Sequence, residues 1–223
     1  MHLTILFTML LVAVAPGAHA DSGKTTRYWD CCKPSCSWSG KAQVSEPVVT
    51  CNQQDQLVVD PNAASACGGG SAYMCSDQSP WAISDSLSYG FAAAKLAGKG
   101  ERDWCCACYK LTFTSTSIAG KQMIVQVTNT GGDLNENHFD IAMPGGGVGQ
   151  FNGCSAQWGN INLGNQYGGF TDRSQCAALP GPWQRGCYWR FDWFQNADNP
   201  SVEFQEVSCP QEMIDRTGCG RWS

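Results

Sequence analysis

The chain has 223 residues, a formal net charge of −5 and only 15% charged residues. A weakly acidic protein of this kind is poorly suited to binding nucleic acid or anionic lipid, so its composition favours a neutral substrate. The length fits one domain with a substantial hydrophobic core.

The chain begins with an apolar run from Leu3 to Ala15, which is too short to span a membrane. The small residues Ala18 and Ala20 follow it with the spacing of a cleavage site, so residues 1–20 are predicted to be a signal peptide. We therefore expect a secreted, extracellular protein. Residues 21–223 are predicted to be a single domain without a linker, an appended module or a membrane anchor.

Two helices are predicted from their start and stop signals. Ser84 or Asp85 can cap a helix whose apolar residues recur at helical spacing and which stops at Gly98. A short helix near the end of the chain is predicted to begin at Pro210 and to end at Gly218.

Strands are predicted where β-branched and aromatic residues gather or alternate with polar ones. These stretches are residues 109–113, 123–127, 188–194 and 202–207. Long segments rich in Gly, Asn and Ser separate them, notably residues 145–153 and 159–169. The pattern indicates a β-rich body with a few helices and long loops, and loops of this length usually carry function.

All 14 cysteines lie after the predicted signal peptide. An even number of cysteines in a secreted chain indicates disulfide bonds, and seven are possible. A metal site is not expected, because His138 is the one histidine after residue 20 and no pair of Cys-x-x-Cys motifs occurs. No cofactor is expected either: the glycine run at residues 145–147 lacks the Lys-Ser/Thr of a phosphate-binding loop.

Residues 25–38 and residues 131–140 hold an unusual concentration of acidic, basic and aromatic side chains. Each feature also has a simpler interpretation. Asp30 and Asp140 could be surface carboxylates or loop caps, and His138 could be a local hydrogen-bond partner. The tryptophans could all belong to the core.

Together, these groups could hydrolyse a glycosidic bond. One protonated carboxyl donates to the leaving oxygen, and a second, ionised carboxyl activates water when the two are about 6.5–9.5 Å apart, which inverts the anomeric centre. The chain has 9 Trp, and exposed aromatic rings can stack on sugars. A Ser-His-Asp hydrolase is disfavoured, because no Gly-x-Ser-x-Gly motif is present.

Four motifs, in this order along the chain, resemble those of glycoside hydrolase family 45, the small endoglucanases. They are TTRYWDCCKPSC at residues 25–36, WCCACY at 104–109, the segment 131–149 with its GGD and PGGGVG, and CYWRFDWF at 187–194. The resemblance implies an all-β dominated fold: a six-stranded double-psi β-barrel with long disulfide-stapled loops, a few short helices and a substrate groove between the loops. It also implies endo-attack on β-1,4-glucan with inversion (EC 3.2.1.4) by a single catalytic domain.

The resemblance assigns roles to individual residues. It implies that Asp30 is the general base, that Asp140 is the general acid, and that Asp133 assists from a loop over the active site. It further implies that Trp38 stacks on a sugar at a distal subsite and that Tyr28 lies beside the base. The remaining positions implied in or beside the groove are Arg27, Lys33, His138 and Asn199.

The resemblance also implies a disulfide pairing, which the cysteine count alone leaves open. The implied bonds are Cys31–Cys154, Cys32–Cys67, Cys36–Cys105, Cys51–Cys75, Cys106–Cys219, Cys108–Cys209 and Cys176–Cys187.

One implied bond bears on the chemistry. Cys31 directly follows Asp30, and Cys154 lies 14 residues after Asp140, so a bond between these cysteines would help hold the two carboxyls at a fixed spacing. From their roles we expect Asp140 to be partly desolvated with a raised pKa, and Asp30 to stay ionised.

Three alternatives to a β-1,4-glucanase stay open. Expansin-like wall-loosening proteins have a similar barrel but typically lack the base at the position of Asp30, which is present here. Another β-glycan, such as xyloglucan, mixed-linkage glucan or glucomannan, could be the substrate of the same catalytic pair. A disulfide-rich defence protein is the third alternative.

We expect a monomer whose partner is a soluble or amorphous β-1,4-glucan polysaccharide or oligosaccharide, with no nucleic acid or membrane partner.

Overall fold

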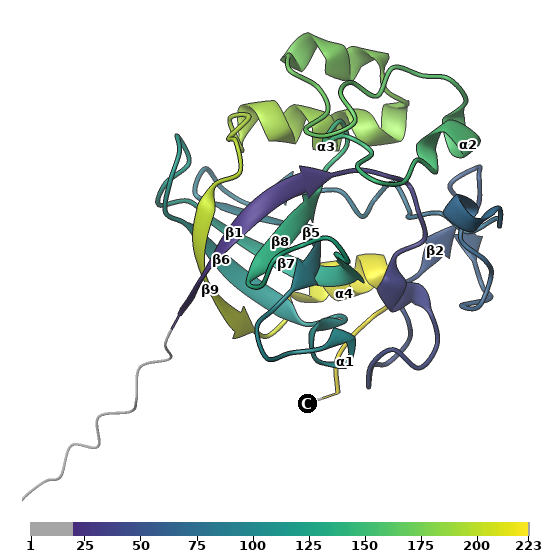
Figure 1. Cartoon of the computed structure of the whole chain (residues 1–223), viewed down its shortest axis with the longest axis horizontal. Helices are drawn as coiled ribbons and strands as arrows, with labels where there is room; N and C mark the ends of the chain where they lie inside the picture. Colours follow the sequence, from purple (N-terminus) through teal and green to yellow (C-terminus); the bar gives the residue numbers. More distant parts are fainter. Residues whose placement is uncertain (1–19, 223) are drawn as a thin grey trace, which may run out of the picture.

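Six strands close into a barrel in the computed structural model, which describes residues 20–222 (Figure 1). The predicted signal peptide therefore lies, except for its last residue, outside the described residues. The barrel strands are β1 (Asp21–Tyr28), β5 (Leu87–Lys95), β6 (Cys108–Phe113), β7 (Gln122–Thr130), β8 (His138–Ala142) and β9 (Ser201–Val207).

The strands follow one another around the barrel in the order β5-β7-β6-β9-β1-β8, and β8 pairs back with β5 to close it. Two pairings are parallel, β1 with β8 and β5 with β7, and the other four are antiparallel. Closure pairs both edges of every barrel strand. The prediction of a six-stranded barrel is confirmed, and the two parallel pairs fit the double-psi arrangement.

Short elements fill the connections between the barrel strands. The strands β2 (Thr50–Cys51) and β3 (Leu57–Val58) pair with each other, and β4 (Trp81–Ala82) pairs with the start of β5, ahead of the residues that pair with β8. Figure 1 shows α3 lying across one end of the barrel with α2 beside it, whereas α4 lies below. The remaining elements are α1 (Glu101–Trp104), α2 (Cys154–Trp158), α3 (Gly181–Asp192), α4 (Gln211–Thr217), and the 3-10 helices η1 (Ser35–Ser37), η2 (Ala66–Gly68) and η3 (Arg173–Ala178).

Aromatic side chains fill the barrel interior. The ring of Phe139 on β8 packs edge-on against Phe204 on β9, with 5.0 Å between centroids, and lies 5.4 Å from the ring of Tyr109 on β6. All three residues are less than 5% exposed. Burial of each such side chain contributes about 1.5–3 kcal/mol, so this cluster is a main source of the barrel's stability.

The predicted helix from Ser84 or Asp85 to Gly98 is wrong, because this stretch forms the barrel strand β5. Its apolar residues suited a helix by spacing, but β5 pairs along both edges and is buried on both faces, which removes the alternation typical of a strand. Gly90 also belongs to a tightly packed strand: a Cβ there would come within 2.4 Å of the Met123 side chain. Tertiary packing has overridden the local pattern.

The predicted strand at residues 188–194 is also wrong, because most of it forms the C-terminal half of α3. The stretch is aromatic, which favours a strand, yet Pro182 lies in the first turn of the helix. Buried residues recur at helical spacing from Trp183 through Cys187 to Arg190. Trp189 and Trp193, four positions apart, stack at 5.4 Å between centroids.

The other predicted elements are confirmed. The strands at residues 109–113, 123–127 and 202–207 correspond to β6, β7 and β9, and the C-terminal helix is α4, which ends at Gly218 in the left-handed conformation. All seven implied disulfide bonds are present with the implied pairing. Among the described residues, no helix is long and apolar enough to cross a membrane.

Candidate active site

A groove of about 990 Å³ is lined by residues of β1, β7 and β8 and of the loops around them. All nine of the residues that the sequence predicts for catalysis or binding line it. They are Arg27, Tyr28, Asp30, Lys33, Trp38, Asp133, His138, Asp140 and Asn199. Both glycine-rich loops, residues 145–153 and 159–169, contribute to the lining as well.

The parallel pairing of β1 and β8 brings the two predicted catalytic carboxyls together. Asp140 pairs with Thr26 in the register of these strands, and Asp30 lies two residues beyond the end of β1. Asp140 itself lies in the middle of β8, and both carboxyls line one groove although they are 110 positions apart in sequence.

Asp30 is only 8% exposed, and hydrogen bonds hold both its side chain and its backbone. The Cys32 N–H donates to its carboxylate at 2.9 Å, and the Gly153 N–H donates to its carbonyl oxygen at 2.8 Å. The Cys31–Cys154 disulfide lies next to it. Burial raises the pKa of the Asp30 carboxyl to about 7; the Cys32 hydrogen bond opposes this rise, and the charge of Asp140 adds to it.

Asp140 is positioned by Thr26, whose hydroxyl donates to its Oδ1 at 2.6 Å. Burial raises the pKa of the Asp140 carboxyl to about 7, against the Thr26 hydrogen bond, and the nearby charge of Asp133 raises it further. The structure thus has the raised pKa expected for the acid. The expected contrast between a protonated Asp140 and an ionised Asp30 is not found, because burial raises the pKa of Asp30 to a similar value.

The prediction from sequence did not single out Thr26. Its hydroxyl lies between two predicted site residues, bonded to Asp140 and 3.0 Å from the His138 Nε2. Burial lowers the pKa of His138, which favours a neutral ring that can donate from Nε2 to the Thr26 oxygen. Thr26 belongs to the motif that contains Asp30, but its role depends on the register of β1 against β8, which the sequence does not reveal.

Lys33 and Trp38 form a single unit in the groove wall. The Lys33 Nζ lies 3.5 Å from the centre of the Trp38 ring and donates to the carbonyl oxygens of Pro61 and Ala63 at 2.6 and 2.9 Å. Lys33 is 5% exposed, so its ammonium supports the ring instead of offering a free charge to substrate. The Trp38 ring is held where a sugar face could stack on it.

The remaining predicted residues border the groove in different ways. The buried Tyr28 hydroxyl accepts a hydrogen bond from Asn129 at 3.3 Å. Arg27 pairs with Asp198 at 3.0 Å, and Asn199 follows with a positive φ of 45°. These contacts shape the groove at the end of β1.

Two exposed aromatic residues in the groove were not predicted. Phe151 is 54% exposed and Tyr167 is 70% exposed, and both lie in the glycine-rich loops. The sequence could have indicated them, because each is a large aromatic residue in a polar, glycine-rich loop. With Trp38, they give the groove three aromatic faces that suit sugar rings.

Arg190 ties the two glycine-rich loops together from below. It is 1% exposed, and its guanidinium donates to the carbonyl oxygens of Gly145, of Gly168 at 2.9 Å and of Phe170 at 2.6 Å. Burial lowers its pKa to about 10. Its hydrogen bonds fix the loops that present the exposed aromatic side chains to the groove.

The groove has no arrangement that suggests a bound metal. Between residues 20 and 222, no three His, Cys, Asp or Glu side chains are grouped so that they could hold an ion. The groups that line the groove include two buried carboxyls, a hydrogen-bonded Thr-His pair and aromatic side chains.

Comparison with known proteins places the chain in a family. The model of glycosyl hydrolase family 45 matches residues 22–220. The chain is 54% identical over 213 residues to an endoglucanase of the springtail Cryptopygus antarcticus, which covers 95% of this chain and 94% of that protein. It is 56% identical over 218 residues to a Fusarium oxysporum protein described as a type K endoglucanase, but it spans only 58% of that protein's length.

A solved structure agrees with the fold. The crystal structure of the Cryptopygus antarcticus cellulase superposes with a TM-score of 0.87 and covers 91% of this chain and 98% of that one, at 54% identity. The match of the family model to nearly the whole described chain, the similarity of the fold and the four sequence motifs agree. The chain therefore belongs to glycosyl hydrolase family 45 and is a glycoside hydrolase.

Proposed function

We propose that the protein is a secreted endo-β-1,4-glucanase that hydrolyses internal bonds of cellulose and related β-glucans with inversion of configuration. The observation that carries this proposal is the pair Asp30 and Asp140, two carboxyls with raised pKa values in one groove. Two relatives of the chain, from Cryptopygus antarcticus and Phaedon cochleariae, are 54% and 44% identical to it and bear the name endoglucanase.

The proposed reaction uses each carboxyl once. In the form that reacts, near pH 7, the pair of carboxyls holds one proton: Asp140 donates it to the glycosidic oxygen as the bond from that oxygen to the anomeric carbon breaks, while Asp30 is ionised. Asp30 takes a proton from a water molecule, which attacks the anomeric carbon from the opposite face. The products are a chain with a free hydroxyl and a new reducing end in the α configuration. Exchange with solvent restores both carboxyls.

Attack within a polymer requires a groove that an internal stretch of chain can enter. Asp133, Phe151 and Tyr167 border the groove and are exposed, so the site is open to solvent. Trp38, Phe151 and Tyr167 can stack on sugar rings, while asparagine and glutamine side chains in the lining can bind hydroxyls. A soluble or amorphous β-1,4-glucan is the substrate that this surface suits best.

Secretion is proposed on separate grounds. The apolar segment at residues 1–20 has the features of a signal peptide, and seven disulfide bonds are typical of proteins that fold in an oxidising compartment. We propose residues 21–223 as the mature catalytic domain.

The direct test is the release of reducing ends from carboxymethyl cellulose by the wild type, Asp30→Asn and Asp140→Asn. We expect wild-type activity and a loss of at least about a thousandfold in each variant, because each removes one proton-transfer group. Circular dichroism and thermal melting serve to show that the variants fold. A wild type that releases no reducing ends from any β-1,4-glucan, yet weakens cellulose networks, would instead favour an expansin-like protein.

A further inference from the structure

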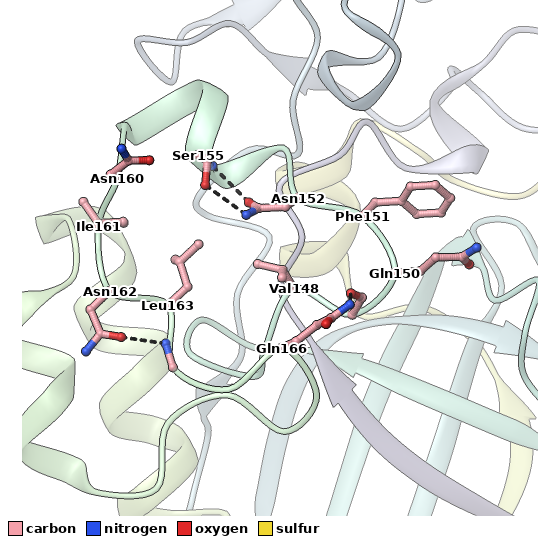
Figure 2. Close-up of a pocket in the computed structure, with 12 residues that line it drawn as sticks. Val148, Gln150, Phe151, Asn152, Ser155, Asn160, Ile161, Asn162, Leu163 and Gln166 are labelled. Atoms are coloured by element: carbon pink, nitrogen blue, oxygen red, sulfur yellow. Dashed lines mark hydrogen bonds between the residues drawn. The ribbon is translucent and has the colours of Figure 1, made fainter.

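A second hollow, of about 740 Å³, lies beside the groove and shares a wall with it. Residues 148–151 and Gln166 line both spaces. The volume falls within the roughly 300–1,000 Å³ typical of small-ligand sites. The side chains that line only the second hollow surround it in Figure 2; they are Asn152, Ser155, Asn160, Ile161, Asn162 and Leu163.

The shared wall is held in place and has two faces. The Gly149 N–H donates to the Gln166 carbonyl at 2.8 Å, and the Gln166 Nε2 donates back to the Gly149 carbonyl at 2.9 Å. In Figure 2, Gln150 and Phe151 project to the side away from Asn160, while the Val148 and Gln166 side chains lie toward the second hollow. The wall therefore separates two binding spaces without closing either.

The lining of the second hollow is uncharged and mixed in polarity. It contains amide and hydroxyl groups together with the apolar side chains of Val148, Ile161 and Leu163, and no acidic or basic residue. The Asn162 Oδ1 accepts from the Gly164 N–H at 2.9 Å, which leaves its NH₂ group to donate to a ligand. Hydroxyls beside apolar C–H faces are what a neutral sugar presents, so this lining matches a glycosyl group.

The hollow is tied to the catalytic base through the backbone. The Asn152 side chain accepts from the Ser155 N–H at 3.0 Å at the start of α2, and the next residue, Gly153, donates its N–H to the Asp30 carbonyl at 2.8 Å. A Cβ at Gly153 would lie 2.9 Å from the Cys67 sulfur, so the segment packs closely against the base. The segment that borders the hollow is therefore packed against the backbone of Asp30.

We propose that this hollow binds a glycosyl branch carried by the glucan chain in the groove. A β-1,4-linked chain is extended and straight, and its primary hydroxyls project sideways. A main chain that follows the groove past Trp38 and Asn199 stays on one side of the wall, whereas a sugar attached to a primary hydroxyl reaches over it. The proposal rests on the proposed glucanase function and names its substrate class as branched, neutral β-1,4-glucans.

The test compares binding of a xylosylated cello-oligosaccharide with that of the unbranched oligosaccharide of the same backbone length, by calorimetry in the Asp140→Asn background. Asn160→Trp is designed to fill the hollow, and Asn162→Ala removes an amide that can donate to the branch. Gln54→Trp, at an exposed turn outside both spaces, is the matched control. We expect Asn160→Trp to weaken binding of the branched ligand about tenfold, Asn162→Ala to weaken it about threefold, and the control to change neither ligand.

Binding of the unbranched ligand should stay within about twofold of its starting value in every variant. Equal weakening of both ligands would overturn the proposal, since the hollow would then hold the main chain. Unchanged binding of the branched ligand in Asn160→Trp, or failure of the parent protein to bind it, would overturn it too. Hydrolysis of the unbranched ligand by the wild type, measured alongside, distinguishes these results from a failure of the proposed glucanase function.

Discussion

Asp30 and Asp140 are buried where their charges are poorly solvated, and this has a consequence for stability. A carboxyl whose pKa is raised from 3.8 to about 7 binds more protons in the folded protein than in the unfolded chain between these pH values. Their contribution to the free energy of unfolding therefore falls as the pH rises from about 4 to about 7, and it stays low above that range.

We predict that Asp30→Asn raises the melting temperature at pH 8 and has little effect at pH 4. The neutral amide removes a buried charge that exists only at the higher pH, with a gain on the order of 1–4 kcal/mol. Asp140→Asn should change stability in the same direction. Differential scanning calorimetry across pH 4–8 measures the effect, and equal gains at both pH values would contradict it.

Thr26 is predicted to act on the acid through one hydrogen bond. The hydrogen bond from Thr26 lowers the pKa of Asp140, and Thr26→Val removes it. The pKa of Asp140 should therefore rise, and the alkaline limb of the profile of kcat/KM against pH should move to higher pH. We expect kcat/KM to fall roughly tenfold, the cost of losing a hydrogen bond to a charged group. Thr26→Ser keeps the hydroxyl and is the control. A uniform loss of activity without movement of the limb would show that Thr26 has only a packing role.

At the scale of elements, the end of β1 and the start of α2 form one unit around the base. The Cys31–Cys154 disulfide and the hydrogen bond from Gly153 to Asp30 join segments that are separated by 123 positions in sequence. The unit holds Asp30 while β8 holds Asp140, so the spacing between the carboxyls depends on it.

Replacing both cysteines of this bond by serine should lower both stability and turnover. We predict a loss of about 2–5 kcal/mol in the free energy of unfolding and a larger loss in kcat than in substrate affinity, because the bond restrains the unfolded chain and also positions the base. Urea unfolding and steady-state kinetics measure the two effects. The matched control is the double serine variant of Cys176–Cys187, which joins η3 to α3. Equal effects on kcat from the two double variants would argue against a positioning role.

The elements show which parts of the fold local sequence can reveal. β6 and β9 were predicted because they alternate apolar and polar residues. β5 was mistaken for a helix because burial on both faces removes the alternation, and α3 was mistaken for a strand because its aromatic residues serve helix packing. The candidate catalytic residues were predicted because the motifs resemble those of a known family. The contact of Thr26 depends on strand register and the raised pKa of Asp30 depends on burial, and neither is a local property.

At the scale of the whole molecule, barrel closure and disulfide bonds convert distant sequence positions into one site. The pairing of β8 with both β1 and β5 places Asp140 in the closed barrel. Arg190 fixes the two glycine-rich loops that line the groove. Local propensity could not predict this closure, because it joins strands that are far apart in sequence. We propose that in this site the two carboxyls work on opposite faces of the sugar, with the attacking water on the side of Asp30.

The anomeric configuration of the first product tests that claim most directly. Proton NMR during hydrolysis of a cello-oligosaccharide records which anomer forms before mutarotation mixes the two. We predict that the α anomer appears first, as direct attack by water activated at Asp30 requires. Initial formation of the β anomer would contradict it, because retention requires a covalent intermediate and a closer pair of carboxyls.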